Sequence, residues 1–268
     1  LAFAHTEGVI HRDLKPANIM TGGFGEVLVL DWGLAVVTGP EGTAEAQVGG
    51  GTPAYMAPEM LRPPFRVGPT SDVYLLGGIL FRLLTGTPPH AGKTASEALR
   101  AVAANVIRNP DGERVQRLDP SGELLAIALQ AMETQPADRY QTVAELQQAI
   151  RGYRSHHESL QLSIHAQAAH AAADADNDYE QYARAVFGFE EALKLWEDNT
   201  SAREGSVTAR LDYALCAERQ GDFELGLSLL DETVPEQRAV ATRLSKARAE
   251  RDSRQSRLRR MKQGLITA

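Results

Sequence analysis

The sequence predicts a mostly α-helical protein made of two parts, and three observations lead to that prediction. The 268 residues are 43% hydrophobic and 24% charged, which is ordinary for a globular chain with a buried core. Up to about residue 152, loops rich in glycine and proline separate short β-branched runs from helical patterns. After about residue 155 proline is rare, and alanine, glutamate, glutamine and arginine dominate, as in an all-helical segment.

The first sixty residues are expected to hold the end of a helix, short strands and a long loop. Residues 1–5 are typical of a helix end, which Gly8 would stop. VIHRDLKPANIM (9–20) predicts a strand, a polar loop and a second strand, and EVLVLDWGLA (26–35) predicts a buried strand that leads into a loop. Residues 36–58, rich in Gly, Pro and Thr, predict a long flexible segment.

Helical patterns follow this loop. SDVYLLGGILFRLLTG (71–86) is apolar almost all round, which predicts a buried central helix with Ser71 as N-cap and Gly86 as its end. TASEALRAVAANVI (94–107) and GELLAIALQAME (122–133) predict two further helices. TVAELQQAIRGYRSH (142–156) opens with Thr142 and Glu145 at the spacing of a capping box.

The second part is expected to form helical hairpins over 156–240 and a basic helix over 241–268. DNDYEQYARAVFGFEEALKLW (176–196) and ARLDYALCAERQGDFELGLSLLDE (209–232) each place an acid and an aromatic residue before an amphipathic helix. The second stretch resembles a tetratricopeptide helix pair. Residues 243–262 carry nine Lys or Arg, and apolar residues recur there at spacings of three and four, which predicts an exposed helix or a weak coiled coil. These apolar residues are Val240, Leu244, Ala247, Leu258, Met261 and Leu265.

Polar residues gather in two loops of the first part. HRDLKPAN (11–18) places Asp13, Lys15 and Asn18 within six residues, and the predicted strand before DWG ends at Asp31. Two acids and an amide in this arrangement can face one point.

Five motifs in this order resemble the catalytic half of a protein kinase, in the style of the bacterial Ser/Thr branch. They are HRDLKPAN, DWG, GTPAYMAPE (51–59), SDVYLLGGILFRLLTGTPPH (71–90) and PADRYQTVAEL (136–146). The resemblance covers residues 1–152. It implies the mostly helical C-lobe of a kinase with short β-hairpins at the catalytic loop. It also implies ATP and Mg²⁺ as cofactors and serine or threonine hydroxyls of proteins as substrates.

The resemblance assigns the chemistry to a few residues. Phosphoryl transfer needs positioning and charge neutralisation more than covalent help. Asp13 would accept the proton of the substrate hydroxyl, and Lys15 would steady the γ-phosphate. Asn18 and Asp31 offer the oxygen ligands that Mg²⁺ prefers, so both are expected at the metal. Gly33 is expected to let the chain turn just after Asp31.

Other residues have supporting roles by resemblance. His11 would brace the DWG segment, and Asp72 would hold the backbone of the catalytic loop. Glu59 is expected to pair with Arg139 in a buried salt bridge, and Thr52 to hydrogen-bond near Asp13 and Lys15.

Regulation is also implied. Arg12 precedes the base, which suggests control by a phosphate on the activation segment. Thr43 and Thr38 are the exposed hydroxyl candidates for that phosphate.

Two departures from the family pattern stand out. The usual Asp-Phe-Gly is Asp-Trp-Gly here, and the Trp32 N–H needs a partner if it is buried. The glycine-rich loop, the strand lysine and the helix glutamate of a kinase have no counterpart before the catalytic loop. GGFGEV (22–27) lies where a hairpin turn belongs, so it is not taken as the phosphate loop. The chain is therefore expected to be a C-lobe without its N-lobe, with little activity alone.

The sequence leaves two other functions open. A non-catalytic half-kinase scaffold that binds protein partners through its helical repeats is the main alternative, and a small-molecule phosphotransferase is a third. The net charge of −7 argues against general nucleic-acid binding, although the basic stretch keeps a membrane-surface or nucleic-acid role open. No run of eighteen apolar residues predicts a membrane span, so we expect a cytoplasmic protein, unless a span lies outside this stretch.

Several other residues are expected to have structural rather than functional roles. The lone cysteine, Cys216, is expected to be a buried small apolar residue. No metal cluster is expected among the histidines, because no acid or cysteine was recognised at ligand spacing. The recurring aromatics of the second part are expected to form an inter-helix core: Tyr179, Phe187, Phe189, Trp196, Tyr213 and Phe223.

Overall fold

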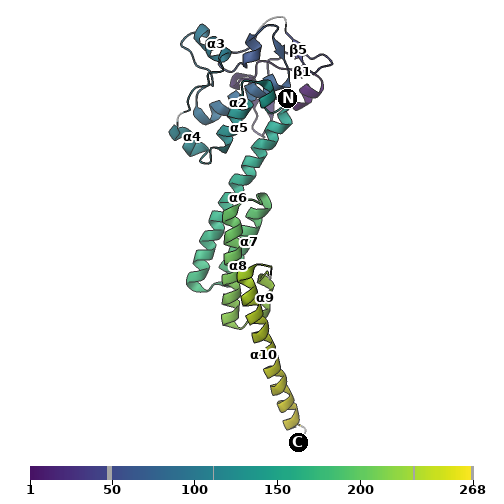
Figure 1. The fold of residues 1–268 in the computed structure, drawn as a ribbon, viewed down its shortest axis with the longest axis vertical. Coiled ribbons are helices and arrows are strands. Elements are labelled where there is room, and N and C mark those ends of the chain that lie inside the picture. The colour runs from purple at the N-terminus through teal and green to yellow at the C-terminus, as the bar shows by residue number, and fades with distance from the viewer. Residues whose placement is uncertain (47–49, 111, 232, 267–268) are drawn as a thin grey trace. The chain divides into compact units, whose positions relative to one another are not determined.

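The computed structural model describes residues 1–46, 50–110, 112–231 and 233–266. The chain divides into two compact units, Leu1–Tyr153 and Arg154–Ala268, which are described separately below. The fold is mostly helical with small antiparallel sheets, as the sequence predicts (Figure 1). No helix among the described residues combines the length and the apolar character that a bilayer crossing needs.

Among the residues that the structure describes, short strands of the first unit pair into three two-stranded antiparallel sheets, β1–β4, β2–β3 and β5–β6. The elements in order are α1 (Ala2–Thr6), β1 (Val9–Ile10), η1 (Pro16–Asn18), β2 (Ile19–Thr21), β3 (Val27–Val29), β4 (Val36–Val37), β5 (Ala44–Glu45), η2 (Pro58–Leu61) and β6 (Arg66–Val67). The loop predicted over 36–58 thus contains two strands, while part of its GGGT stretch lies outside the described residues. The prediction that residues 26–35 form a buried strand is wrong. Val27 is 63% and Leu28 55% exposed, because β3 pairs only with β2 and a two-stranded ribbon gives its side chains few neighbours.

The central helix α2 (Pro69–Thr85) is buried along most of its length. Its N-cap is Gly68, with Pro69 in the first turn, so Ser71 is not the N-cap. Ser71 is instead the third helical residue, where its hydroxyl accepts from Gly68 N (3.3 Å) and donates to Glu59 (2.8 Å). Gly86 ends α2 with φ +79°, as expected.

Shorter helices and the start of a long helix follow α2 in the first unit. α3 (Ala95–Ala103) is capped by Thr94, and α5 (Glu123–Ala131) packs against α2. α4 (Gly112–Leu118) has no counterpart among the predicted helices. Near its start, α6 (Val143–Asp176) has half of the predicted capping box: Thr142 accepts from Glu145 N (3.1 Å), but the Glu145 carboxylate accepts from Gln141 N (2.8 Å). A short 3-10 turn, η3 (Pro136–Asp138), precedes α6.

The second unit is all helical. After α6 it contains α7 (Tyr179–Leu195), α8 (Thr200–Gln220), α9 (Phe223–Leu229) and α10 (Pro235–Ile266). Consecutive helices are antiparallel neighbours, joined by short connections (Figure 1). Asp178 caps α7 by accepting from Glu180 N, and Asp222 caps α9 by accepting from Leu225 N. The acid and aromatic pairs noted in the sequence therefore do open helices.

The core of the second unit contains small residues and aromatic rings. Phe189 and Tyr213 are buried as expected, and the Tyr213 ring stacks on Tyr182 at 5.4 Å. Cys216 is buried, as predicted. The prediction that Phe187 belongs to the core is wrong, because Phe187 lies on the outer face of α7 and is 62% exposed.

Candidate active site around Asp13

The loop between β1 and η1 is held by a carboxylate at the start of α2. Asp72, which is fully buried, accepts from His11 N through Oδ2 and from Arg12 N through Oδ1, both at 2.8 Å. His5 Nε2 lies 2.8 Å from the same Oδ2, a contact that the sequence analysis missed. These bonds fix Arg12 in a left-handed conformation (φ +72°), which a non-glycine residue adopts at an energetic cost. The loop is thus rigid just before Asp13.

Asp13 is the centre of a hydrogen-bond network, and its side chain is nearly buried. Its Oδ1 accepts from Thr52 Oγ1 at 2.8 Å. Its Oδ2 accepts from Lys15 Nζ at 2.6 Å and from Asn18 Nδ2 at 3.2 Å. Lys15 Nζ also donates to Thr52 Oγ1 at 2.9 Å. The structure therefore brings together four predicted site residues from two segments about 37 residues apart.

A further hydrogen bond fixes the orientation of the Asn18 side-chain amide. Its Nδ2 also donates to the Asp13 backbone oxygen at 2.8 Å, so the amide plane is fixed from the nitrogen side. The remaining Oδ1 is a neutral oxygen of the kind that binds Mg²⁺.

Asp31 is placed near Asn18 by the β2–β3 hairpin. Ile19 pairs with Val29, and Leu30 N donates to the Asn18 backbone oxygen at 2.8 Å, one residue before Asp31. Asp31 is exposed and left-handed (φ +60°). One anionic and one neutral oxygen ligand fit a hard divalent cation, so Asn18 and Asp31 can hold Mg²⁺.

The prediction that Gly33 lets the chain turn after Asp31 is wrong. The left-handed residue of this turn is Asp31, and Gly33 does not have a positive φ. A Cβ at position 33 would lie 3.2 Å from Asp31 Oδ1, which accepts from Gly33 N at 3.4 Å. Glycine here leaves room for the carboxylate rather than supplying the turn.

His11 and Trp32 join the two loops. His11 Nε2 lies 3.0 Å from the Leu30 backbone oxygen, and its ring centroid is 4.6 Å from that of Trp32. Trp32 is 39% exposed rather than buried, and its Nε1 still donates to Val29 O at 3.0 Å.

Arg12 is the buried cation of the site. Its Nη1 donates to Leu34 O at 3.2 Å. Burial lowers the pKa of the Arg12 guanidinium, and the negative charge of Asp72 opposes that shift. The two candidate phosphate acceptors, Thr38 and Thr43, are half-buried rather than exposed.

Arg139 and Glu59 form the expected ion pair. Arg139 Nη1 donates to Glu59 Oε1 at 2.7 Å, and Nη2 donates to Oε2 at 2.9 Å. The pair ties the segment after GTPAYMA to the residues that precede α6.

A groove of about 270 Å³ opens beside Lys15. Tyr55 and Arg82 are close neighbours in it; burial raises the Tyr55 pKa, and the charge of Arg82 opposes that shift. The groove is lined by Lys15, Pro16, Ala17, Ala54, Tyr55, Arg82 and Pro88.

Comparison with known proteins finds similarity in the first unit. The family model described as "Protein kinase domain" matches residues 1–150. The chain is 40% identical over 149 residues to "Serine/threonine-protein kinase PknB" of Mycobacterium tuberculosis H37Rv, which covers 54% of this chain and 23% of that protein. It is 40% identical over 153 residues to "Probable serine/threonine-protein kinase CE0033" of Corynebacterium efficiens, covering 54% of this chain and 22% of that protein. The chain therefore spans less than a quarter of the length of these relatives.

Proposed function

The chain belongs to the protein kinase family, and from that membership we propose that residues 1–152 support ATP-dependent phosphoryl transfer to serine and threonine hydroxyls of proteins. One observation carries this proposal: the Asp13 carboxylate accepts bonds from Thr52, Lys15 and Asn18 at once. The bonds hold Asp13 in one orientation beside a cation. A carboxylate that three donors hold in one orientation fits the role of a catalytic base.

In the proposed reaction the substrate hydroxyl donates a hydrogen bond to Asp13. Its oxygen attacks the γ-phosphorus in line with the departing ADP oxygen, and its proton passes to the Asp13 carboxylate. Lys15, which already contacts both Asp13 and Thr52, neutralises negative charge on the transferred group. Asn18 and Asp31 would hold Mg²⁺, which supplies neutralisation of the phosphate charge.

Apolar side chains are exposed around Asp31, among them Trp32, Leu34 and Leu30. We propose that this face forms one wall of a nucleotide cleft. A kinase supplies the other wall with a glycine-rich loop and a strand lysine, neither of which is recognised within these 268 residues. The 268-residue chain alone should accordingly bind ATP weakly and transfer little phosphate.

The helices after residue 155 are proposed to recruit a protein partner through tetratricopeptide-like hairpins over 156–240. The close approach of α9 to both α8 and α10 supports this proposal, since a Cβ at Gly226 would lie 3.1 Å from Leu244 on α10 and 3.3 Å from Ala214 O on α8. Glycine and alanine positions are part of the tetratricopeptide repeat pattern. The basic helix over 241–268 would flank this region.

The substrate class is testable with a lobe chimera. Its N-terminal glycine-rich lobe comes from the M. tuberculosis relative, and residues 1–268 of this chain follow. The chimera is incubated with Mg²⁺, γ-labelled ATP and a protein mixture, and the labelled protein is acid-hydrolysed. We expect phosphoserine and phosphothreonine. A chimera whose melting temperature rises with Mg²⁺-ATP, yet labels only tyrosine or only small molecules, contradicts the proposal.

A further inference from the structure

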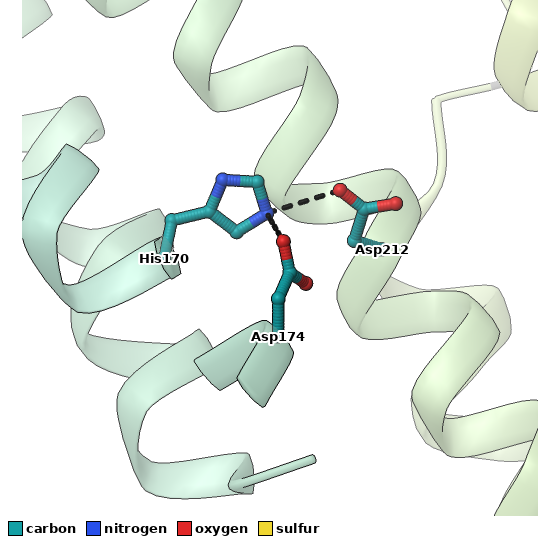
Figure 2. Close-up of side chains that lie close together, drawn as sticks. All are labelled: His170, Asp174 and Asp212. Atoms are coloured by element: carbon teal, nitrogen blue, oxygen red, sulfur yellow. Dashed lines mark hydrogen bonds and ion pairs between the residues drawn. The ribbon is translucent and has the colours of Figure 1, made fainter. Parts of the chain in front are cut away.

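A second cluster of polar side chains lies within the helical unit, between α6 and α8. Figure 2 shows the His170 imidazole pointing toward two carboxylates, Asp174 one turn later on α6 and Asp212 on α8. His170 Nε2 lies 3.0 Å from Asp212 Oδ2 and 3.8 Å from Asp174 Oδ2. One ligand atom from each of the three residues falls within 4.8 Å of the others. The cluster contradicts the expectation of no metal-binding group among the histidines, because Asp174 follows His170 at position i+4 and Asp212 lies 42 residues after His170.

The separations match those around a small metal ion. Zinc lies about 2.0–2.2 Å from imidazole nitrogen and carboxylate oxygen, so neighbouring ligand atoms of a tetrahedral site are about 3.4 Å apart. The observed 3.0 and 3.8 Å lie on either side of that value. Rotamer adjustments of the exposed Asp174 would complete a three-ligand site.

The simpler interpretation is an ion pair that joins the two helices. An ion pair does not explain why two carboxylates converge on His170 Nε2, because one N–H group donates well to only one acceptor. Two carboxylates side by side repel each other, and a divalent cation between them removes that repulsion. Both carboxylates reach solvent, Asp174 with 51% of its side chain exposed, so an ion has a way in.

The Asp174 carboxylate is also oriented from outside the cluster. Tyr182 on α7 is buried, and its hydroxyl donates to Asp174 Oδ1 at 2.6 Å. This bond uses one carboxylate oxygen and leaves the other, Oδ2, on the side of His170. Hydrogen bonds of this kind to a ligand carboxylate commonly tune metal affinity.

We propose that His170, Asp174 and Asp212 bind a divalent transition-metal ion of the zinc class. One imidazole and two carboxylates form its ligand set, and a water molecule takes the fourth position. The ion joins α6 to α8 and stabilises the helical unit. One nitrogen and two oxygen ligands favour Zn²⁺, Co²⁺ or Mn²⁺ over Cu⁺, which prefers sulfur.

The test uses the full 268-residue chain freed of metal and kept in excess Mg²⁺, which saturates oxygen-only sites. Co²⁺ is titrated while its visible absorption is followed, and Zn²⁺ is then added to displace it. We expect one Co²⁺ per chain with tetrahedral-type absorption, and a higher melting temperature with Zn²⁺. His170→Gln should weaken Co²⁺ binding by more than about 100-fold. His165 is an exposed histidine on the same helix, so His165→Gln should leave the Co²⁺ affinity unchanged.

Two more variants keep the test independent of folding defects. Asp174→Asn changes an exposed carboxylate and should lose metal affinity while the metal-free chain keeps its helical circular dichroism. Tyr182→Phe keeps the buried ring and should weaken binding by about 10–100-fold through the lost hydroxyl alone. No saturable Co²⁺ binding, or equal binding by the His170→Gln and His165→Gln chains, overturns the proposal and leaves an ion pair between the helices.

Discussion

Arg139 and Glu59, 80 residues apart in the sequence, are joined by two hydrogen bonds of 2.7 and 2.9 Å. The Arg139 side chain is fully buried, and it also donates to the backbone oxygens of Glu133, Thr70 and Thr134. Ser71 donates to Glu59 as well, so the pair links three segments of the first unit.

Glu59→Gln leaves a buried guanidinium without its counter-charge. We expect the free energy of unfolding of the first unit to fall by about 3–5 kcal/mol. Asp138→Asn changes an exposed carboxylate of η3 in the same unit and should change this free energy by less than about 0.5 kcal/mol. Urea unfolding is followed through Trp32 in a Trp196→Phe background, since the chain has two tryptophans and one lies in each unit. Equal losses in the two variants would contradict the buried-pair account.

His90 predicts a pH dependence of stability. Burial is the main cause that lowers the pKa of His90 below its ordinary 6.5, and the ring lies 2.8 Å from the Tyr74 hydroxyl. The unfolded chain therefore binds more protons than the folded chain between the lowered pKa and about 6.5. The contribution of His90 is present above pH 6.5 and is lost as the pH falls below it.

The unfolding free energies of the wild type and His90→Gln are compared from about pH 7.5 down to about pH 5, a range that includes the ordinary histidine pKa of about 6.5. The difference in unfolding free energy should stay constant above about pH 6.5. Below that pH the wild type should lose stability relative to His90→Gln. A difference that does not change with pH would rule out a buried neutral His90.

Two glycines inside helices should respond in opposite directions to alanine. A Cβ at Gly205 on α8 would clash with the buried Phe189 ring, whereas no atom of another described part of the chain lies within 4 Å of a Cβ at Gly152 on α6. Gly205→Ala should destabilise the second unit by about 1–3 kcal/mol through overpacking. Gly152→Ala should stabilise by about 0.5–1 kcal/mol through helix propensity. Urea unfolding, followed by the tryptophan of each unit, measures both, and stabilisation by Gly205→Ala would refute the packing of α7 on α8.

Much of the first unit was predictable because its motifs place chemically distinct residues at fixed spacings. The helix over 71–86 and the pairing of Glu59 with Arg139 both follow from such motifs. Ser71 was misplaced because Gly68 caps the helix and Pro69 begins it, three residues before the start that an N-cap at Ser71 implies.

Contacts between segments distant in the sequence were harder to predict. His5 reaches Asp72 across 67 residues, and no local pattern marks that contact. The exposure of Val27 depends on how few strands the sheet contains, which β propensity does not reveal. The cluster of His170 with Asp212 depends on the packing of α6 and α8, which helix periodicity alone does not fix.

The most direct test of the central claim measures the rate of γ-phosphate transfer by the lobe chimera with and without the Asp13 carboxylate. Asp13→Asn keeps the size of the side chain but cannot accept the hydroxyl proton, so the rate should fall by about 10²–10⁴-fold. Stabilisation of the chimera by Mg²⁺-ATP should persist, because Asn18 and Asp31 remain. Asp138→Asn, which changes an exposed carboxylate in η3, should keep the full rate. An Asp13→Asn chimera that transfers phosphate as fast as the Asp138→Asn chimera would contradict the assignment of Asp13 as the base.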